Sequence, residues 1–459
     1  MIHRFLNATK ANSRFSRTRL KPAARKPNLK LRMDGFKGGI SDTLARMTPE
    51  ELHKQISDLF DLTDDDIKAF TPFPDENDPG IFEGEPHPDD DVRTHVQVGD
   101  SQCLLTGHLK RRLEHISGCP RPLKETRDKA YRISTSVHRG LVMFAARQFK
   151  TGDLVADERP LMVYPIDPPT NLSFLASTWV DEYLLQDVVG SIFEYMSEES
   201  QDTFMGLRNR HLHDGCGPLL GVARTNGYVL DGDLMDSTRD TYFIPTTSNN
   251  ENIQGKFGRY TSVYKDLSRV NHSCSPNTYR KFHMATFSMQ LRAARDIEEG
   301  EEIFTTFTTD ILQPAAERAK DLVPYGTECT CRACLDPTKS DPIRAAVRRG
   351  SKYALYTSYA EIDAAVRTLA RIEQEELHAS AAYRQTLHEL FSAYLYLHDE
   401  KTALMYGEKL WLARLASGEP LYEVFRNAEA MKKSPQWITG KLASRMGSPA
   451  HLMFKFASS

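Results

Sequence analysis

The chain has 459 residues, of which 40% are hydrophobic and 26% charged, and its net charge is −3. This length predicts two or three structural units, with enough apolar side chains for a core. No run approaches the ~20 apolar residues of a membrane span. Seven cysteines in so long a chain do not indicate a secreted disulfide scaffold. We therefore expect a soluble protein that does not enter a membrane.

The net charge hides an asymmetry along the chain. Residues 1–33 hold ten Lys and Arg and no acid, which leaves 49 basic against 62 acidic residues in the rest. An acidic body is poorly suited to a phosphate backbone, so direct nucleic-acid binding is not expected. The Arg-rich opening is typical of a mitochondrial transit peptide. The alternatives are a disordered basic tail and a nuclear signal in RTRLKPAARKPNLKLR, with the nucleus or cytoplasm as location.

Residues 34–128 are predicted to form a helical extension with an acidic linker. A helix is expected over 48–70, where Thr48 begins a capping box. The proline-rich stretch 71–91 holds eight acids and no Lys or Arg, which favours a solvated linker. A second short helix is expected over 101–118, ending at a glycine.

From Tyr131 the pattern changes to short apolar runs broken by glycines, which predicts paired strands. A helical pattern returns over about 172–216. We expect a loop and then a strand over 217–230, and further strands over 283–307. Residues from 341 onward carry helical apolar stripes typical of stacked antiparallel helices, although no clean 34-residue repeat is found.

Three of the cysteines form a C-x-C-x-x-C cluster: Cys329, Cys331 and Cys334. Thiolates this close can reach one ion, but a structural zinc needs four ligands in a tetrahedron. Cys216 and Cys274 are the candidates for the fourth position. The alternative is three reduced thiols without a metal.

Cys274 lies in the stretch RVNHSCSPN, which allows three interpretations. It could be a nucleophile paired with His272, but such pairs are usually assembled from distant parts of a chain, and no third orienting residue is evident. It could be the missing zinc ligand. The stretch could also be only a turn, because Asn271, Pro276 and Asn277 favour turn geometry.

Several segments together resemble one family. RVNHSCSPN (269–277), GEEIFTTF (300–307) and CTCRAC (329–334), in this order and spacing, resemble the core and post-SET motifs of SET-domain protein lysine methyltransferases. TNGY (225–228) resembles the short segment that precedes the core motif. The stretch before CTCRAC is most similar to SET-and-MYND proteins and their fungal relatives, although a MYND zinc module is missing.

The resemblance implies specific ligands. Cys274 would join Cys329, Cys331 and Cys334 on one zinc, which excludes Cys216. S-adenosyl-L-methionine would be the cofactor. The residues that match its binding positions are Arg139, Gly140, Asn226, Asn271, His272 and Tyr325. The implied reaction is methyl transfer to a lysine of a protein substrate. We expect the protein to be a monomer.

Two positions depart from the family pattern. Phe307 stands where the family has a catalytic tyrosine, and Val142 stands where the first turn usually has a second glycine, so it would crowd the cofactor or force a different turn. Another hydroxyl, such as that of Tyr264, could substitute for the tyrosine, or the substrate could be unusual. The competing hypothesis is a catalytically impaired SET-fold adaptor that binds protein.

We expect an α+β fold: a β-rich SET core with a helical insertion, a zinc-bound post-SET loop and an α-helical carboxyl-terminal domain. The expected parts are a basic tail (1–33), a helical extension with a linker (34–128), a SET domain (129–308), a post-SET zinc loop (309–336) and a helical domain (341–459).

Overall fold

A computed structural model describes residues 72–75, 87–90, 92–124, 130–136, 140–166, 178–230, 260–350 and 359–446. All of them belong to one compact unit that begins at Pro72. The basic tail at 1–33 and the helix expected over 48–70 lie outside the described residues. In the described part, no helix combines the length and apolarity needed to cross a membrane.

The largest sheet has five strands in the order β1-β2-β6-β8-β7. Their bounds are β1 (Arg93–Val98), β2 (Ser101–Thr106), β6 (Met162–Pro165), β8 (Tyr260–Val263) and β7 (Tyr228–Val229). The helix expected over 101–118 is wrong in its first third, because Ser101–Thr106 pairs with β1 as an antiparallel hairpin. Only α5 (Gly107–His115) is helical, with Thr106 as its N-cap.

Three smaller sheets complete the β core. They are β10 (Thr278–His283)-β11 (Ser288–Ala293)-β5 (Leu154–Glu158), β12 (Phe304–Thr305)-β9 (Asn271–His272), and β3 (Tyr131–Ser136)-β4 (Gly140–Ala145). The β9–β12 pair is parallel and joins two of the motifs named above, since Asn271 is opposite Phe304 and His272 opposite Thr305. The paired strands expected from Tyr131 are confirmed.

Helices α6 (Thr178–Glu194), α7 (Glu198–Met205) and α8 (Pro218–Asn226) form an insertion between β6 and β7. The loop expected at the start of 217–230 is wrong, because Pro218 sits in the first turn of α8, where its missing N–H costs nothing. Apolar side chains of this insertion, among them Ile192, Phe204 and Leu220, form a second buried cluster with residues of β6 and β8.

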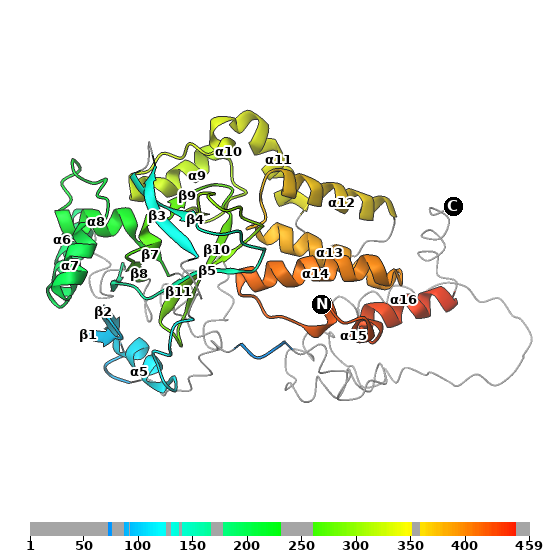
Figure 1. Cartoon of the computed structure of the whole chain (residues 1–459), viewed down its shortest axis with the longest axis horizontal. Helices are drawn as coiled ribbons and strands as arrows, with labels where there is room; N and C mark the ends of the chain where they lie inside the picture. The colour runs from blue at the N-terminus through cyan, green and yellow to red at the C-terminus, as the bar shows by residue number, and fades with distance from the viewer. Residues whose placement is uncertain are drawn as a thin grey trace, which may run out of the picture. The chain divides into compact units, whose positions relative to one another are not determined.

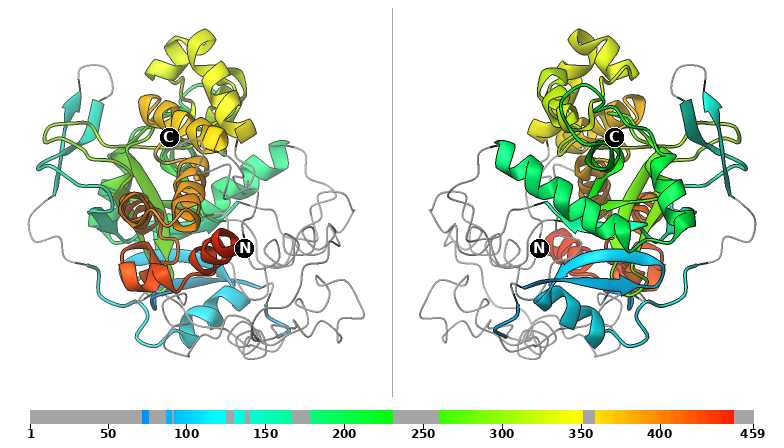
Figure 2. Two further views of the ribbon diagram at one scale, coloured as in Figure 1. Left: turned by 90° about the vertical axis from the view of Figure 1, so that its right-hand side faces the viewer. Right: turned by 90° about the vertical axis from the view of Figure 1, so that its left-hand side faces the viewer.

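The chain then runs through α9 (Ala315–Leu322), η2 (Val323–Tyr325), α10 (Arg332–Leu335) and α11 (Pro337–Gly350). The remaining elements are α12 (Tyr359–Gln374), α13 (Ala381–Tyr396), α14 (Glu400–Ser417), η3 (Glu423–Phe425), α15 (Ala428–Lys432) and α16 (Pro435–Met446). Helices α12, α13 and α14 pack side by side (Figure 1). In both views of Figure 2 the yellow α11 and the blue β1–β2 hairpin lie at opposite ends of the β core.

The helical region is joined to the β core through β10. Lys281 donates a hydrogen bond to the Gly418 carbonyl at 2.6 Å, and the Tyr279 hydroxyl donates to the His378 carbonyl at 3.1 Å. At the amino-terminal end, Pro72 forms a β-bridge with Tyr422, so the predicted linker is docked at its start. The predicted α+β class, with a helical insertion and a helical carboxyl-terminal region, is confirmed.

Candidate functional site

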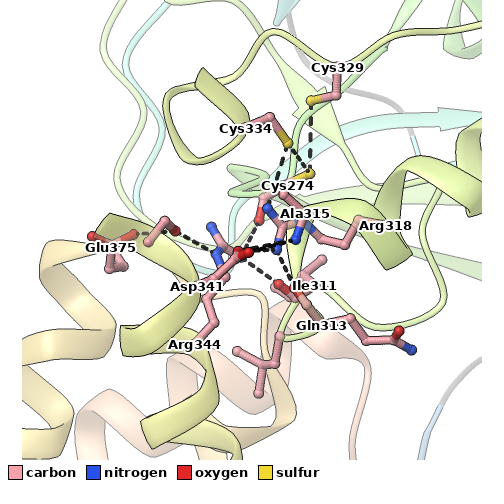
Figure 3. Close-up of polar contacts among 12 residues, drawn as sticks. Cys274, Ile311, Gln313, Ala315, Arg318, Cys329, Cys334, Asp341, Arg344 and Glu375 are labelled. Atoms are coloured by element: carbon pink, nitrogen blue, oxygen red, sulfur yellow. Dashed lines mark hydrogen bonds and ion pairs between the residues drawn. The ribbon is translucent and has the colours of Figure 1, made fainter. Parts of the chain in front are cut away.

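Four cysteine sulfurs converge next to β9. The Sγ atoms of Cys274, Cys329, Cys331 and Cys334 all lie within 4.8 Å of one another, and Cys216 is not among them. Cys274 Sγ is 3.8 Å from Cys329 Sγ and 3.5 Å from Cys334 Sγ (Figure 3). A zinc–sulfur bond of about 2.3 Å in a tetrahedron places neighbouring sulfurs ~3.8 Å apart. The spacing therefore fits one tetrahedral ion held by four thiolates.

The four thiols compete for their protons. Hydrogen bonds among the sulfurs raise the pKa of Cys274 and lower the pKa of Cys334. Four thiols at this spacing cannot all ionise without a positive charge among them. A divalent cation supplies such a charge, which favours metal over free thiols.

Two buried arginines lie beside the cysteines (Figure 3). Arg318, 1% exposed, places Nη2 3.6 Å from Cys334 Sγ, and its Nη1 donates to the Gln313 carbonyl. Arg344, 0% exposed, donates to the Cys274 carbonyl at 2.9 Å. Buried charges persist only when they are paired. Four thiolates around one divalent ion would leave excess negative charge, which these two guanidinium groups would offset.

His272 links the cysteine cluster to the position of the expected tyrosine. Its Nδ1 accepts a hydrogen bond from the Phe307 N–H at 3.0 Å, and its Nε2 lies 3.3 Å from Cys274 Sγ. Burial lowers the pKa of His272 to about 4, so the ring is neutral. Because Nδ1 accepts, the single ring proton sits on Nε2, where it can donate to the Cys274 sulfur.

Phe307 lies in an aromatic cluster. Its ring stacks on Tyr325, with centroids 4.9 Å apart, and meets the edge of Tyr228 at 5.8 Å and the ring of His272 at 5.6 Å. The structure thus brings three predicted site residues, Phe307, Tyr325 and His272, to one place. Tyr228 was missed by the sequence reasoning, although it ends the quoted TNGY segment.

Tyr264 is separated from Phe307 by the ring of Tyr228. It is fully buried, its ring meets Tyr228 at 5.7 Å, and its hydroxyl accepts a hydrogen bond from Ser262 Oγ at 2.9 Å. The Tyr228 hydroxyl donates to the Leu267 carbonyl at 2.8 Å. Both tyrosine hydroxyls thus have partners within the protein. A role for Tyr264 in place of the missing tyrosine stays a prediction.

Two asparagines use their amide N–H groups inside the protein. Asn226, at the end of α8, donates to the carbonyls of Arg208 at 2.6 Å and Val222 at 2.7 Å. Asn271 donates to Glu302 Oε1 at 2.7 Å. In the described part of the chain, neither amide oxygen has a hydrogen-bond partner, so both offer acceptors to a ligand.

The first turn of the predicted cofactor site is only partly described. Arg139 lies outside the described residues. Gly140 has a φ of +72°, a conformation that side chains with a Cβ rarely adopt. Val142 is buried within β4 and pairs with Ser134 in unbroken register, so the strand accommodates its branched side chain. Its contact with a cofactor stays a prediction.

Comparisons with known proteins agree with this geometry. A model of the SET domain matches residues 140–308. N-lysine methyltransferase SMYD2-B of Danio rerio is 38% identical over 95 residues, which cover 20% of this chain and 20% of that protein. Histone-lysine N-methyltransferase set5 of Schizosaccharomyces pombe is 32% identical over 139 residues, covering 30% of this chain and 35% of that protein. N-lysine methyltransferase SMYD2 of Homo sapiens is 28% identical over 196 residues, which cover 36% of this chain and 42% of that protein.

These matches span between 20% and 42% of the relatives' own lengths. A solved structure of ctPRC2 in complex with H3K27me3 and H3K27M overlaps with a TM-score of only 0.21 at 10% identity, covering 74% of this chain and 35% of that one. The sequence relatives and the matched domain point to one family. The chain carries a SET domain and is related to the SET-domain lysine methyltransferases of the Set5 and SMYD2 type.

Proposed function

We propose that this protein is an S-adenosyl-L-methionine-dependent protein-lysine N-methyltransferase. The observation that carries the proposal is the parallel pairing of Asn271–His272 with Phe304–Thr305. Within the segment that matches the SET domain, this pairing sets the NHSC stretch beside Phe307 and Tyr325. The relatives, all named lysine methyltransferases, do not favour the adaptor hypothesis.

The residues present fit the cofactor. S-adenosyl-L-methionine supplies a methyl group on a sulfonium centre, and its amino-acid end carries an ammonium group. The amide oxygens of Asn226 and Asn271 are acceptors suited to that ammonium. The half-buried ring of Tyr325 offers a face on which an adenine can stack. We infer that these residues hold the cofactor, together with the backbone at Gly140 and His272 and, by resemblance, Arg139.

The acceptor lysine must lose a proton before it can attack the methyl group. A free lysine has a pKa near ~10.4, which burial among apolar groups and a nearby cation lower. The rings of Tyr228 and Phe307 supply the apolar surroundings, and the Arg280 guanidinium lies 5.1 Å from the Tyr228 ring centroid. Alignment of donor and acceptor provides most of the remaining rate. Without a hydroxyl at position 307, the rate is expected to be about 10²–10³ lower than with one.

Binding and turnover test this proposal in two steps. Calorimetry on the full chain should show one S-adenosyl-L-methionine per protein, and Asn271→Ala should weaken that binding. Methyl transfer from labelled cofactor should then appear on lysines of candidate proteins and disappear when their lysines are blocked. A full chain that holds its metal but binds no cofactor would refute the proposal. Binding without transfer to any protein would instead support the adaptor.

We also propose that the four clustered cysteines hold one structural zinc. Metal analysis should give one zinc per chain, and Cys274→Ala should lower that value. The matched control is Cys216→Ala, because Cys216 lies outside the cluster and should leave the zinc content unchanged. An equal loss from both variants would overturn the ligand assignment.

The remaining expectations concern location and partners. If residues 1–33 direct import into mitochondria, the substrate is expected to be a mitochondrial protein. Imaging a tagged form of this protein should then show mitochondrial fluorescence, and removal of residues 1–33 should abolish it. A cytoplasmic or nuclear signal for both forms would contradict it. The monomeric state and the lack of nucleic-acid binding also stay predictions.

A further inference from the structure

The segment between α7 and α8 is tied to the turn that carries Tyr325. The His211 side chain, 5% exposed, lies between two oxygen atoms. Its Nδ1 is 2.6 Å from Asp214 Oδ2, and its Nε2 is 3.1 Å from the carbonyl oxygen of Pro324, the residue before Tyr325. The contact therefore crosses from the helical insertion to η2.

Both partners of His211 are acceptors. A carboxylate and a backbone carbonyl carry no proton to donate, and a neutral imidazole donates from only one of its two nitrogens. Both contacts are hydrogen bonds at the same time only when the ring is an imidazolium. The hydrogen bond from His211 lowers the pKa of Asp214, and the Cys216 N–H donates to the other carboxylate oxygen at 3.0 Å. Asp214 is thus fixed as the anionic partner.

A second contact holds the same turn on the other side of Tyr325. Arg210 Nη1 donates to the Gly326 carbonyl at 3.3 Å, and the Arg210 N–H donates to Thr225 Oγ1 of α8 at 3.0 Å. Gly326 has a φ of +57°, and a Cβ there would lie 3.0 Å from the Arg210 Cβ. The carbonyls on both sides of Tyr325 are therefore held by consecutive residues of one segment.

Asp214 contacts His211 directly. Its carboxylate is also close enough to Arg224 of α8 for that charge to act on it, and the hydrogen bond from His211 together with Arg224 lowers the pKa of Asp214. Asp214 therefore stays a carboxylate and orients the ring of His211.

We propose that His211, oriented by Asp214, is a positioning residue that holds the Pro324–Gly326 turn and thereby raises cofactor affinity. This inference rests on the proposed function, in which Tyr325 packs against the cofactor. The contacts of His211 and Arg210 with the carbonyls of Pro324 and Gly326 keep Tyr325 stacked on Phe307. Loss of the His211 contact removes one of these two ties and loosens the turn.

The test is cofactor binding by calorimetry on the full chain at a single pH, with steady-state methyl transfer measured beside it. Cofactor affinity should be about fivefold lower in His211→Gln than in the native protein, as expected for one hydrogen bond. The cofactor KM should rise by the same factor, whereas kcat at saturating cofactor should not change. His213→Gln is the matched control, because His213 is an exposed histidine of the same segment. It should behave as the native protein does.

Asp214→Asn gives an independent measurement if His211→Gln does not fold, since the Asp214 side chain is 43% exposed. It removes the anionic partner and should also lower cofactor affinity. Equal cofactor affinity in the native protein and in Asp214→Asn or His211→Gln would overturn the inference. A native protein that binds no cofactor would instead refute the proposed function.

Discussion

Tyr228 presents its ring to the edge of Phe307, with centroids 5.8 Å apart and ring planes inclined at 84°. Its hydroxyl points away from that contact, since it donates to the Leu267 carbonyl at 2.8 Å. The wall beside Phe307 is therefore aromatic, and the phenol at Tyr228 does not supply the missing hydroxyl. If chemistry occurs here, desolvation and alignment must provide more of the rate than usual.

A hydroxyl at position 307 should accelerate the proposed methyl transfer. We expect Phe307→Tyr to raise kcat by about tenfold to a hundredfold, because one preorganised polar group at a reacting centre is typically worth about 10²–10³ and a restored group recovers only part of this. Single-turnover methyl transfer with saturating cofactor measures the effect. Phe73→Tyr adds the same hydroxyl at a half-exposed position and should leave kcat unchanged. A lower kcat in Phe307→Tyr would show that the phenylalanine is adapted to its substrate.

Arg280 provides the second prediction, because its guanidinium lies 5.1 Å from the Tyr228 ring centroid. A fixed positive charge disfavours a second one nearby, so it lowers the pKa of a lysine that enters beside Tyr228. Arg280→Met should raise that pKa and move the acidic limb of the kcat/KM profile toward higher pH, with a lower rate near pH 7. Arg280→Lys keeps the charge and serves as the control. Superimposable profiles for Arg280→Met and the native protein would contradict this role.

The third prediction concerns the half-buried carboxyl group of Glu158. Glu158 accepts hydrogen bonds from the N–H groups of Lys265 and Leu267, each at 2.8 Å, and so holds the turn that precedes the NHSC stretch. Burial nevertheless raises the pKa of Glu158 from 4.5 to about 7. A group whose pKa is raised in the folded state stabilises the fold fully below its unfolded pKa, and this contribution is lost as pH rises through the folded value.

The free energy of unfolding should therefore fall by up to ~3 kcal/mol between about pH 4.5 and 7 through this group. Urea unfolding at several pH values measures the change. Glu158→Gln keeps an oxygen acceptor but does not titrate, so its stability should vary less over this window. If both proteins show the same pH dependence, Glu158 is ionised throughout.

The sequence predicted the motifs better than their surroundings. The C-x-C-x-x-C cluster is visible as spacing and Cys274 was assigned to it by resemblance, and the structure brings the four sulfurs together. Residues 101–106 were misread because SQCLLT precedes a true helix and its alternating burial is evident only once β1 pairs with it. Tyr228 and His211 depend on contacts with residues far along the chain, which no local pattern reveals.

The burial of Arg318 and Arg344 could not be predicted from the sequence either, because both belong to helices whose charged residues are typical of an exposed surface. Their burial at 1% and 0% exposure follows from partners across the fold: Cys334 and Asp341 for Arg318, and backbone carbonyls and the Ser340 hydroxyl for Arg344. Each would be a costly isolated charge in a core without those partners.

The last prediction tests this charge balance at the zinc site. Arg318→Met removes the guanidinium 3.6 Å from Cys334 Sγ while keeping much of the side-chain volume. It should lower the free energy of unfolding of the metal-loaded protein by about 3–5 kcal/mol, the usual result of breaking a buried charge pair. It should also speed zinc release to a chelator, because the excess negative charge on the thiolates is no longer offset. Arg332→Met, whose side chain is 74% exposed, is the matched control and should change neither quantity. Faster zinc release without a loss of stability would confine the role of Arg318 to the metal, and no change in either quantity would show that the thiolate charge is balanced elsewhere.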